Sequence, residues 1–376
     1  MPPGTTKPLR IVRRRVPGTY PTRQGSTGDK HTTFRREENE LSMGRSRAAV
    51  AAALLTTLAL LPIAAAPVLA QAQAGAEQSR VLNYWTRERI ANAKPRDFVR
   101  NANGSFSLAK ATPRAKPGGS GNNVLGASWT GGGAVLKLSG KVLFTMNSGD
   151  YICSGTLITD SANDRSIVIT AGHCSYDAAD GGFARNWTFY PEFDTNATYT
   201  CSQSKWGCWV ATALAVHNGF AQSGGFNTQA TTYDWSFAVL KNGGFANNLA
   251  ETALGGTMAR TLTAPAVGSQ TFNFGYPAAG KYHGYDLTYC SDQIFNDPLN
   301  QNLTFGVDCD MTGGSSGGPW LGNFNSSSGA GTVDSVNSYG YGGQKKEYGP
   351  KFNSNTSATF NASLNASANT LVGTAP

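Results

Sequence analysis

The stretch GGSSGGPW, at Gly313–Trp320, places a serine inside a glycine-rich turn. A second stretch, SIVITAGHC, is a β-branched run that ends with His173 and Cys174, and a third, YDWSFAVLK, puts Asp234 directly ahead of an apolar run. A serine hydroxyl is a poor nucleophile until a base takes its proton and N–H donors stabilise the oxyanion that forms. Together the stretches predict a nucleophile, Ser316, a general base, His173, and an acid that orients the base, Asp234.

The glycines around Ser316 have a second expected role. They let the backbone turn sharply and bring N–H groups close to a substrate carbonyl, where a Cβ would clash. We therefore expect the N–H groups of Gly314 and Ser316 to form an oxyanion hole. An ordinary Gly/Ser loop, like NSSSGAG at 325–331, is the alternative for this stretch taken alone.

Three other aspartates in the same interval compete with Asp234 as the acid. Asp177 and Asp180 lie too near His173 in sequence, within one loop, and Asp194 lies in a polar stretch. Asp234 is preferred because a charged residue just before an apolar strand is well placed to lie buried behind a histidine.

Taken together, CSGTLI, TAGHC, DWSFAVL and GGSSGGP resemble the shared blocks of the chymotrypsin/trypsin-like serine peptidases, over roughly residues 125–352. MTGGSSGGPW and FGYPAAG are similar to the secreted bacterial trypsin-like and glutamyl-endopeptidase-like branches. The resemblance implies an all-β fold of two antiparallel β-barrels, with the active site in the cleft between them. His173 and Asp234 would come from the first barrel and Ser316 from the second, in an endopeptidase that works through an acyl-enzyme.

The same resemblance implies substrate-binding positions. Asp310 lies six residues before Ser316, where trypsin carries the acid that attracts Arg or Lys, and NSYG matches the substrate-binding strand, which contributes Ser338 and Gly340. Cys309 lies seven residues before Ser316, whereas the usual family cysteine lies four before it. Asn337 stands where glutamyl endopeptidases commonly have a histidine, which removes the main support for cleavage after Glu.

One departure concerns activation. Trypsin-like zymogens usually have an aspartate immediately before the nucleophile, which pairs with the new N-terminal amine after activation. Here that position is Ser315. Any propeptide must therefore act differently, by blocking the cleft or by assisting folding.

The pattern of short apolar runs and turns supports an all-β domain at 124–352. Ten short β-like runs alternate there with glycine-rich and polar turns. They are GAVLKL, KVLFTM, YICSGTLI, SIVITAG, CWVATALAV, WSFAVLK, TFNFGYP, YDLTYC, LTFGVDC and TVDSVNSYGY. We expect the first barrel at about 124–245 and the second at about 246–352, followed by a flexible Asn/Ser/Ala/Thr-rich tail at 353–376.

The N-terminal third is expected to be removed or disordered. Residues 43–74 have a short basic start, an apolar run and a small-residue end, the pattern of a secretory signal peptide. A membrane anchor is the alternative, which two prolines and the cleavage-like end disfavour. Residues 1–42 are a basic, proline-rich extension ahead of a preferred initiator at Met43. Residues 75–123 are a charged, then Gly/Pro-rich connector that we interpret as a propeptide.

Charge and cysteine content argue against nucleic acid and zinc as ligands and in favour of disulfides. Residues 1–120 carry a net charge of +13 and residues 121–376 a net charge of −5, so the domain lacks a basic surface for nucleic acid. Six cysteines in an exported chain fit three disulfides, for which Cys153–Cys174, Cys201–Cys208 and Cys290–Cys309 is the simplest pairing. A zinc site is disfavoured because there are no CxxC pairs.

These observations predict a secreted, monomeric serine protease, made as a zymogen. It would act on proteins or peptides without a cofactor or metal, and without membrane contact after signal removal. The main alternative is a catalytically inactive trypsin-fold protein that binds proteins or peptides. An esterase would more often carry a GxSxG elbow in an α/β chain, which is not the pattern here.

Overall fold

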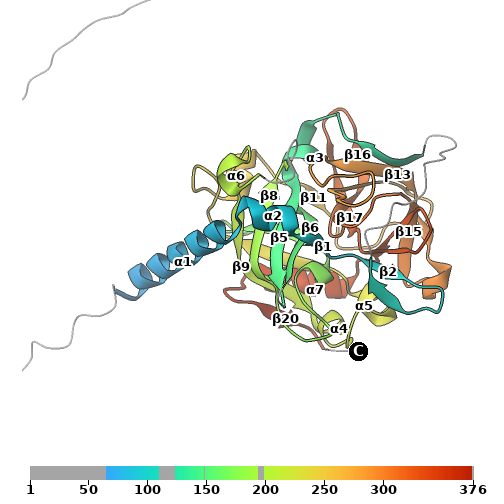
Figure 1. Cartoon of the computed structure of the whole chain (residues 1–376), viewed down its shortest axis with the longest axis horizontal. Coiled ribbons are helices and arrows are strands. Elements are labelled where there is room, and N and C mark those ends of the chain that lie inside the picture. Colours follow the sequence, from blue (N-terminus) through green and yellow to red (C-terminus); the bar gives the residue numbers. More distant parts are fainter. Residues whose placement is uncertain (1–64, 110–122, 148, 194–198, 375–376) are drawn as a thin grey trace, which may run out of the picture. The chain divides into compact units, whose positions relative to one another are not determined.

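β-Strands dominate the described part of the chain, as the alternating runs predicted (Figure 1). The structure is a computed structural model that describes residues 65–109, 123–147, 149–193, 199–374. The predicted extension at 1–42 and most of the predicted signal peptide lie outside these residues. Nine of the ten β-like runs form strands, and the all-β prediction is confirmed.

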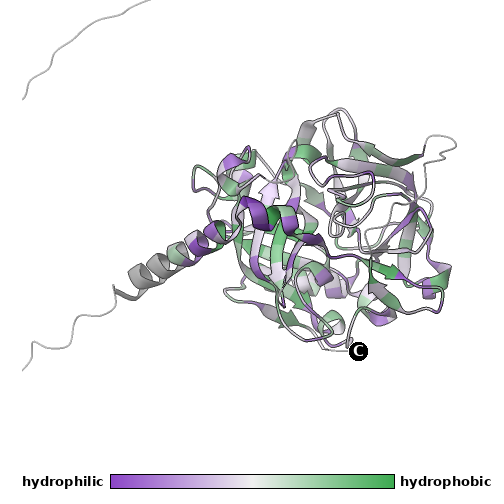
Figure 2. Ribbon diagram, viewed as in Figure 1, coloured by the Kyte–Doolittle hydropathy of each residue, from purple (hydrophilic) through white to green (hydrophobic). Residues whose placement is uncertain are grey.

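The first barrel is a closed sheet of six antiparallel strands, in the order β6-β5-β8-β9-β10-β7, which closes through pairing of β6 with β7. Its strands are β5 (Ser139–Met146), β6 (Gly149–Ile158), β7 (Ser166–Thr170), β8 (Arg185–Pro191), β9 (Trp209–His217) and β10 (Ser236–Leu240). Every residue of β5, β7 and β10 is buried, because their apolar and β-branched side chains fill both faces of the barrel wall. Figure 2 colours much of this wall as hydrophobic.

The second barrel consists of two sheets that enclose a core around Trp320. One sheet contains β11 (Ala259–Arg260), β17 (Ala330–Val336), β16 (Pro319–Asn325), β12 (Gln270–Gly275), β13 (Thr288–Gln293) and β4 (Val124–Ser128). The other contains β14 (Phe295–Asn296), β15 (Thr304–Asp308), β19 (Lys346–Pro350), β18 (Tyr339–Tyr341), β2 (Phe98–Arg100) and β3 (Phe106–Leu108). Although β4 lies in the range expected for the first barrel, it pairs with β13 of the second.

One predicted strand is wrong. GAVLKL forms helix α3 (Gly133–Leu138), because Val135 and Leu138 are spaced to share one buried helical face. The N–H groups of Ala134 and Val135 donate to the carbonyls of Ser328 and Gly329, which anchors this first turn. The other helices outside the N-terminal segment are α4 (Asn218–Ala221), α5 (Thr228–Thr232), α6 (Ala250–Leu254) and α7 (Ser354–Ser363).

The C-terminal segment is not the flexible tail that its composition suggested. Asn353 caps α7 in a reciprocal capping box with Thr356, and Phe360 is buried against the first barrel. Beyond the helix, β20 (Thr370–Val372) pairs in parallel with β9. Small polar residues can form a stable helix here because a cap and one aromatic anchor supply what the low apolar content does not.

The segment expected as a polar connector is also structured up to Ala109. It forms α1 (Ala65–Tyr84), α2 (Arg87–Asn92), β1 (Lys94–Pro95), and the hairpin of β2 and β3. Trp85 and Ile90 are buried, and β1 pairs in parallel with β6. The Gly/Pro-rich part, 110–122, lies outside the described residues. Among the helices of the described residues, none has the length and apolarity to cross a bilayer.

Candidate active site

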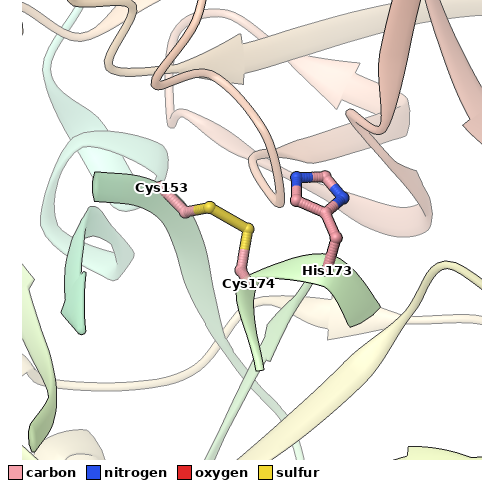
Figure 3. A group of neighbouring side chains, drawn as sticks. All are labelled: Cys153, His173 and Cys174. Atoms are coloured by element: carbon pink, nitrogen blue, oxygen red, sulfur yellow. A yellow bond between two sulfur atoms is a disulfide. The ribbon is translucent and has the colours of Figure 1, made fainter. Parts of the chain in front are cut away.

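His173 lies at the end of β7, in a short 3₁₀ turn, η1 (Gly172–Cys174). The disulfide Cys153–Cys174 joins this turn to β6 of the same barrel, and Figure 3 shows it directly beside the imidazole. The other disulfides join Cys201 to Cys208 and Cys290 to Cys309, so all three pairs match the simplest pairing in the sequence. Sulfur and nitrogen atoms of Cys153, His173 and Cys174 lie within 4.8 Å of one another, but the disulfide leaves no thiolate to bind a metal.

Asp234 holds His173 at two points. Its Oδ2 lies 2.8 Å from His173 Nδ1, and its Oδ1 accepts the backbone N–H of His173 at 2.8 Å. The register of the barrel explains this contact, since β10 pairs with β7 so that Ser236 lies opposite Thr170. The residues just before β10 therefore meet those just after β7. Both side chains are fully buried.

A further hydrogen bond on this carboxylate comes from the second barrel. Ser338 Oγ donates to Asp234 Oδ2 at 2.5 Å. The acid therefore accepts three hydrogen bonds, which fix its plane and leave it no freedom to rotate away from the imidazole. Ser338, expected from the family resemblance to bind substrate, has its side chain committed to this contact.

The competing aspartates serve other partners. Asp177 pairs with Arg96 at 2.9 Å, with both side chains buried, and Asp180 accepts from Asn147 Nδ2 at 2.8 Å. Although burial alone raises it, the net pKa of Asp177 is lowered by the Arg96 guanidinium and by the backbone N–H groups at 179 and 180. Asp194 lies outside the described residues.

The loop with Ser316 packs directly onto the barrel that carries His173. The carbonyl of Ser316 accepts the N–H of Ser154, in β6, at 2.7 Å. Gly317 has a φ of +79°, and a Cβ there would lie 2.1 Å from Thr170 Oγ1. Gly314 has a φ of +102°, and a Cβ there would meet the backbone of 276 and 278. Only glycine permits these close approaches of the Ser316 loop to its own protein.

An acidic residue that lies in none of the three motifs also contacts this site. Ser316 Oγ donates to Asp97 Oδ1 at 2.6 Å, and the N–H of Gly314 donates to Asp97 Oδ2 at 2.7 Å. Among the described residues, His173 Nε2 is buried with no hydrogen-bond partner. Asp97 thus engages both Ser316 and one predicted oxyanion-hole donor. In the sequence, Asp97 belongs to an ordinary charged stretch, KPRDFVR, far from the three motifs.

The predicted substrate-binding residues have different surroundings in the structure. Gly340 lies in β18, where it pairs with Val99 of the N-terminal segment. Asp310 is 2% exposed and is bound by Lys281 Nζ at 3.0 Å and by Tyr282 OH at 2.5 Å. Gly340 also lines a small cavity beside the Ser316 loop, together with Asp97, Phe98, Val99, Ala109, Thr312, Gly313, Ser315, Tyr339 and Glu347.

Comparisons with known proteins identify a family and similar structures. The family model described as the C-terminal domain of lysyl endopeptidase matches residues 133–241, a range that includes His173 and Asp234. The thermostable serine protease AL20, from an extremophilic microorganism, is 32% identical, with 61% of this chain and 98% of AL20 covered and a TM-score of 0.53. The protease Anisep, from Arthrobacter nicotinovorans, is 35% identical, with 61% and 96% covered and a TM-score of 0.52. No curated protein sequence gave a significant match.

AL20 and Anisep are covered almost end to end at more than 30% identity, and the fold is the pair of β-barrels that the motifs implied. The chain therefore belongs to the bacterial branch of the chymotrypsin-like serine proteases.

Proposed function

We propose that this protein is a secreted serine endopeptidase that uses Ser316, His173 and Asp234 as its catalytic triad. The observation that carries the proposal is the two-point contact between Asp234 and His173 in a fully buried setting. Because a carboxylate accepts the Nδ1 proton, the imidazole keeps Nε2 as its basic nitrogen. Three disulfides agree with a protein that works outside the reducing cytoplasm.

The proposed triad implies the following reaction. As Ser316 Oγ attacks the substrate carbonyl carbon, His173 Nε2 takes the hydroxyl proton. The N–H groups of Gly314 and Ser316 stabilise the oxyanion. The proton then passes to the leaving amine as the C–N bond breaks, which leaves an ester on Ser316. Water, deprotonated by the same nitrogen, hydrolyses that ester and regenerates the serine.

A fluorophosphonate probe tests the nucleophile. The purified chain, as secreted and after limited proteolysis, is treated with the probe, and the labelled peptide is identified by mass spectrometry. We expect the label on Ser316, none on Ser316→Ala, and a loss of about 10⁶ in peptide turnover for that variant. Ser326→Ala, in the exposed Gly/Ser loop, is the matched control and should behave as the parent. A parent that is folded, processed and unlabelled would instead support an inactive peptide-binding protein.

We also propose that the enzyme prefers basic residues on the acyl side of the scissile bond. Lysyl endopeptidase names the matching family model, and Glu347 lines the cavity beside Gly313 and Ser315. Glu347 is 4% exposed, so its carboxylate would offer a buried negative charge to Lys or Arg. Asp310, the acid expected from sequence position, is the alternative.

The cleavage preference of two variants on a peptide library distinguishes Glu347 from Asp310 as the selecting acid. If Glu347 selects basic residues, Glu347→Gln should lower kcat/KM for Lys and Arg substrates by about 10²-fold or more, since a buried charge loses its partner. Asp310→Asn should leave the preference in place. The reverse result would assign the selection to Asp310, and a parent with no basic preference would remove both assignments.

A further inference from the structure

The chain's own segment 94–109 runs from the first barrel to the second (Figure 1). β1 extends the first barrel beside β6, and β2 then pairs with β18 of the second barrel. β3 folds back on β2, and the N–H of Ala109 returns to the carbonyl of Asp97 at 2.8 Å. Since β19 covers the other edge of β18, an extended substrate could pair with β18 only by displacing β2.

Within this segment, Asp97 occupies the reacting positions themselves. Its two oxygens bind Ser316 Oγ and the Gly314 N–H, at 2.6 and 2.7 Å. The hydroxyl that should point to His173 Nε2 is thereby turned to another acceptor, and that nitrogen has no partner among the described residues. One carboxylate therefore occupies an oxyanion donor and separates the nucleophile from its base.

The residues on either side of Asp97 fix it in place. Arg96 Nη2 pairs with Asp177 at 2.9 Å, and its Nη1 donates to the carbonyl of His173 at 3.2 Å. Phe98 stacks on Phe226, with ring centroids 4.0 Å apart, and meets the His173 ring edge-on at 5.4 Å. A buried ion pair and an aromatic stack on both sides leave the carboxylate little room to move.

We propose that segment 94–109 is an autoinhibitory strap that keeps the enzyme latent, with Asp97 as the inhibitory group. The proposal rests on the triad assignment above. The strap is not itself a substrate at this point, because the group beside Ser316 Oγ is a carboxylate. A carboxylate lacks an amine leaving group, and its negative charge repels nucleophilic attack. Release requires a cut between Ala109 and Val124, where β4 begins.

The test measures how fast a fluorophosphonate labels Ser316 in the full-length chain. Asp97→Ala should label at least about tenfold faster than the parent, because two charge-assisted hydrogen bonds to the site are lost. Glu88→Ala, which removes one exposed acid from α2 of the same N-terminal region, is the matched control and should label at the parental rate. Immobilised trypsin, for which Lys110 and Arg114 supply sites after the strap, should raise the parental rate to that of Asp97→Ala.

A second measurement guards against a variant that fails to fold. A synthetic peptide of residues 94–109 should slow labelling of the trypsin-processed enzyme, and the same peptide with Asp97→Ala should slow it at least about tenfold less. Equal rates for parent and Asp97→Ala, together with two equally weak peptides, would overturn the strap while leaving the triad standing. If no form is ever labelled at Ser316, the proposed function fails, and the inhibitory role fails with it.

Discussion

Replacing Asp234 by Asn tests the role of the acid without changing its shape. In the parent, Asp234 Oδ1 accepts the backbone N–H of His173, while Oδ2 faces His173 Nδ1 and Ser338 Oγ. In Asp234→Asn the amide oxygen must keep the first of these positions, because the –NH₂ group cannot accept an N–H. The –NH₂ group then faces Nδ1 and donates to it.

That donation reverses the tautomer. Nδ1 becomes an acceptor, so the imidazole proton moves to Nε2, the atom that should take the proton of Ser316. We expect kcat to fall by about 10⁴, or about 5.5 kcal/mol in activation free energy, with the fold retained. Ser338→Ala removes one of three hydrogen bonds to the carboxylate and should cost about tenfold or less.

The assay is steady-state hydrolysis of a peptide amide by processed enzyme, beside thermal unfolding of each variant. The free energy of unfolding of Asp234→Asn should stay within about 1 kcal/mol of the parental value, because every polar group at this position keeps a hydrogen-bond partner. If Asp234→Asn retains more than a tenth of the parental kcat with its fold intact, the tautomer argument is wrong. A loss of similar size in Ser338→Ala would show that orientation, and not the proton position, dominates.

Two further predictions concern stability. Burial raises the pKa of Asp334 to about 7, so its contribution to stability is present below about pH 4 and is lost as the pH rises through about 7. Asp334→Asn should therefore match the parent at pH 4 and exceed its unfolding free energy by up to about 4 kcal/mol at pH 8, a gain that equal urea midpoints at pH 8 would rule out. Phe360→Ala should lower the free energy of unfolding by about 3–5 kcal/mol. The ring is 2% exposed and packs edge-on against Phe237, with ring centroids 5.4 Å apart. The exposed Asn361→Ala is its control, and a cost below 1 kcal/mol for Phe360→Ala would restore the view of a loosely attached tail.

The parts of the site that follow from local chemistry could be predicted from the sequence. The glycines around Ser316 predict a turn, and the β-branched run before His173 predicts a strand that ends there. Asp234 lies directly before an apolar strand, which predicts its position. GAVLKL misled because a six-residue apolar run fits a strand or a helix equally well, and contacts with the 328–329 turn decide the outcome. The C-terminal helix was missed for the opposite reason, since its stability depends on one cap and one buried ring.

Asp97 could not have been found in this way, because its importance depends on a contact across 219 positions of the chain. The departure at Ser315 indicated only that a propeptide must act differently from the trypsin-like scheme. A chain without an aspartate before the nucleophile lacks the internal ion pair that would complete the oxyanion hole after activation, so a different device must control that hole. In this structure a carboxylate does lie at the Gly314 N–H, but it comes from outside the loop, on a segment that precedes the barrels. Under the strap proposal, activation means removing a negative charge from the oxyanion hole, whereas in the trypsin-like scheme it means supplying a positive charge beside it. The Asp97→Ala labelling rate therefore decides between a preformed hole that is merely covered and a hole that must still be built.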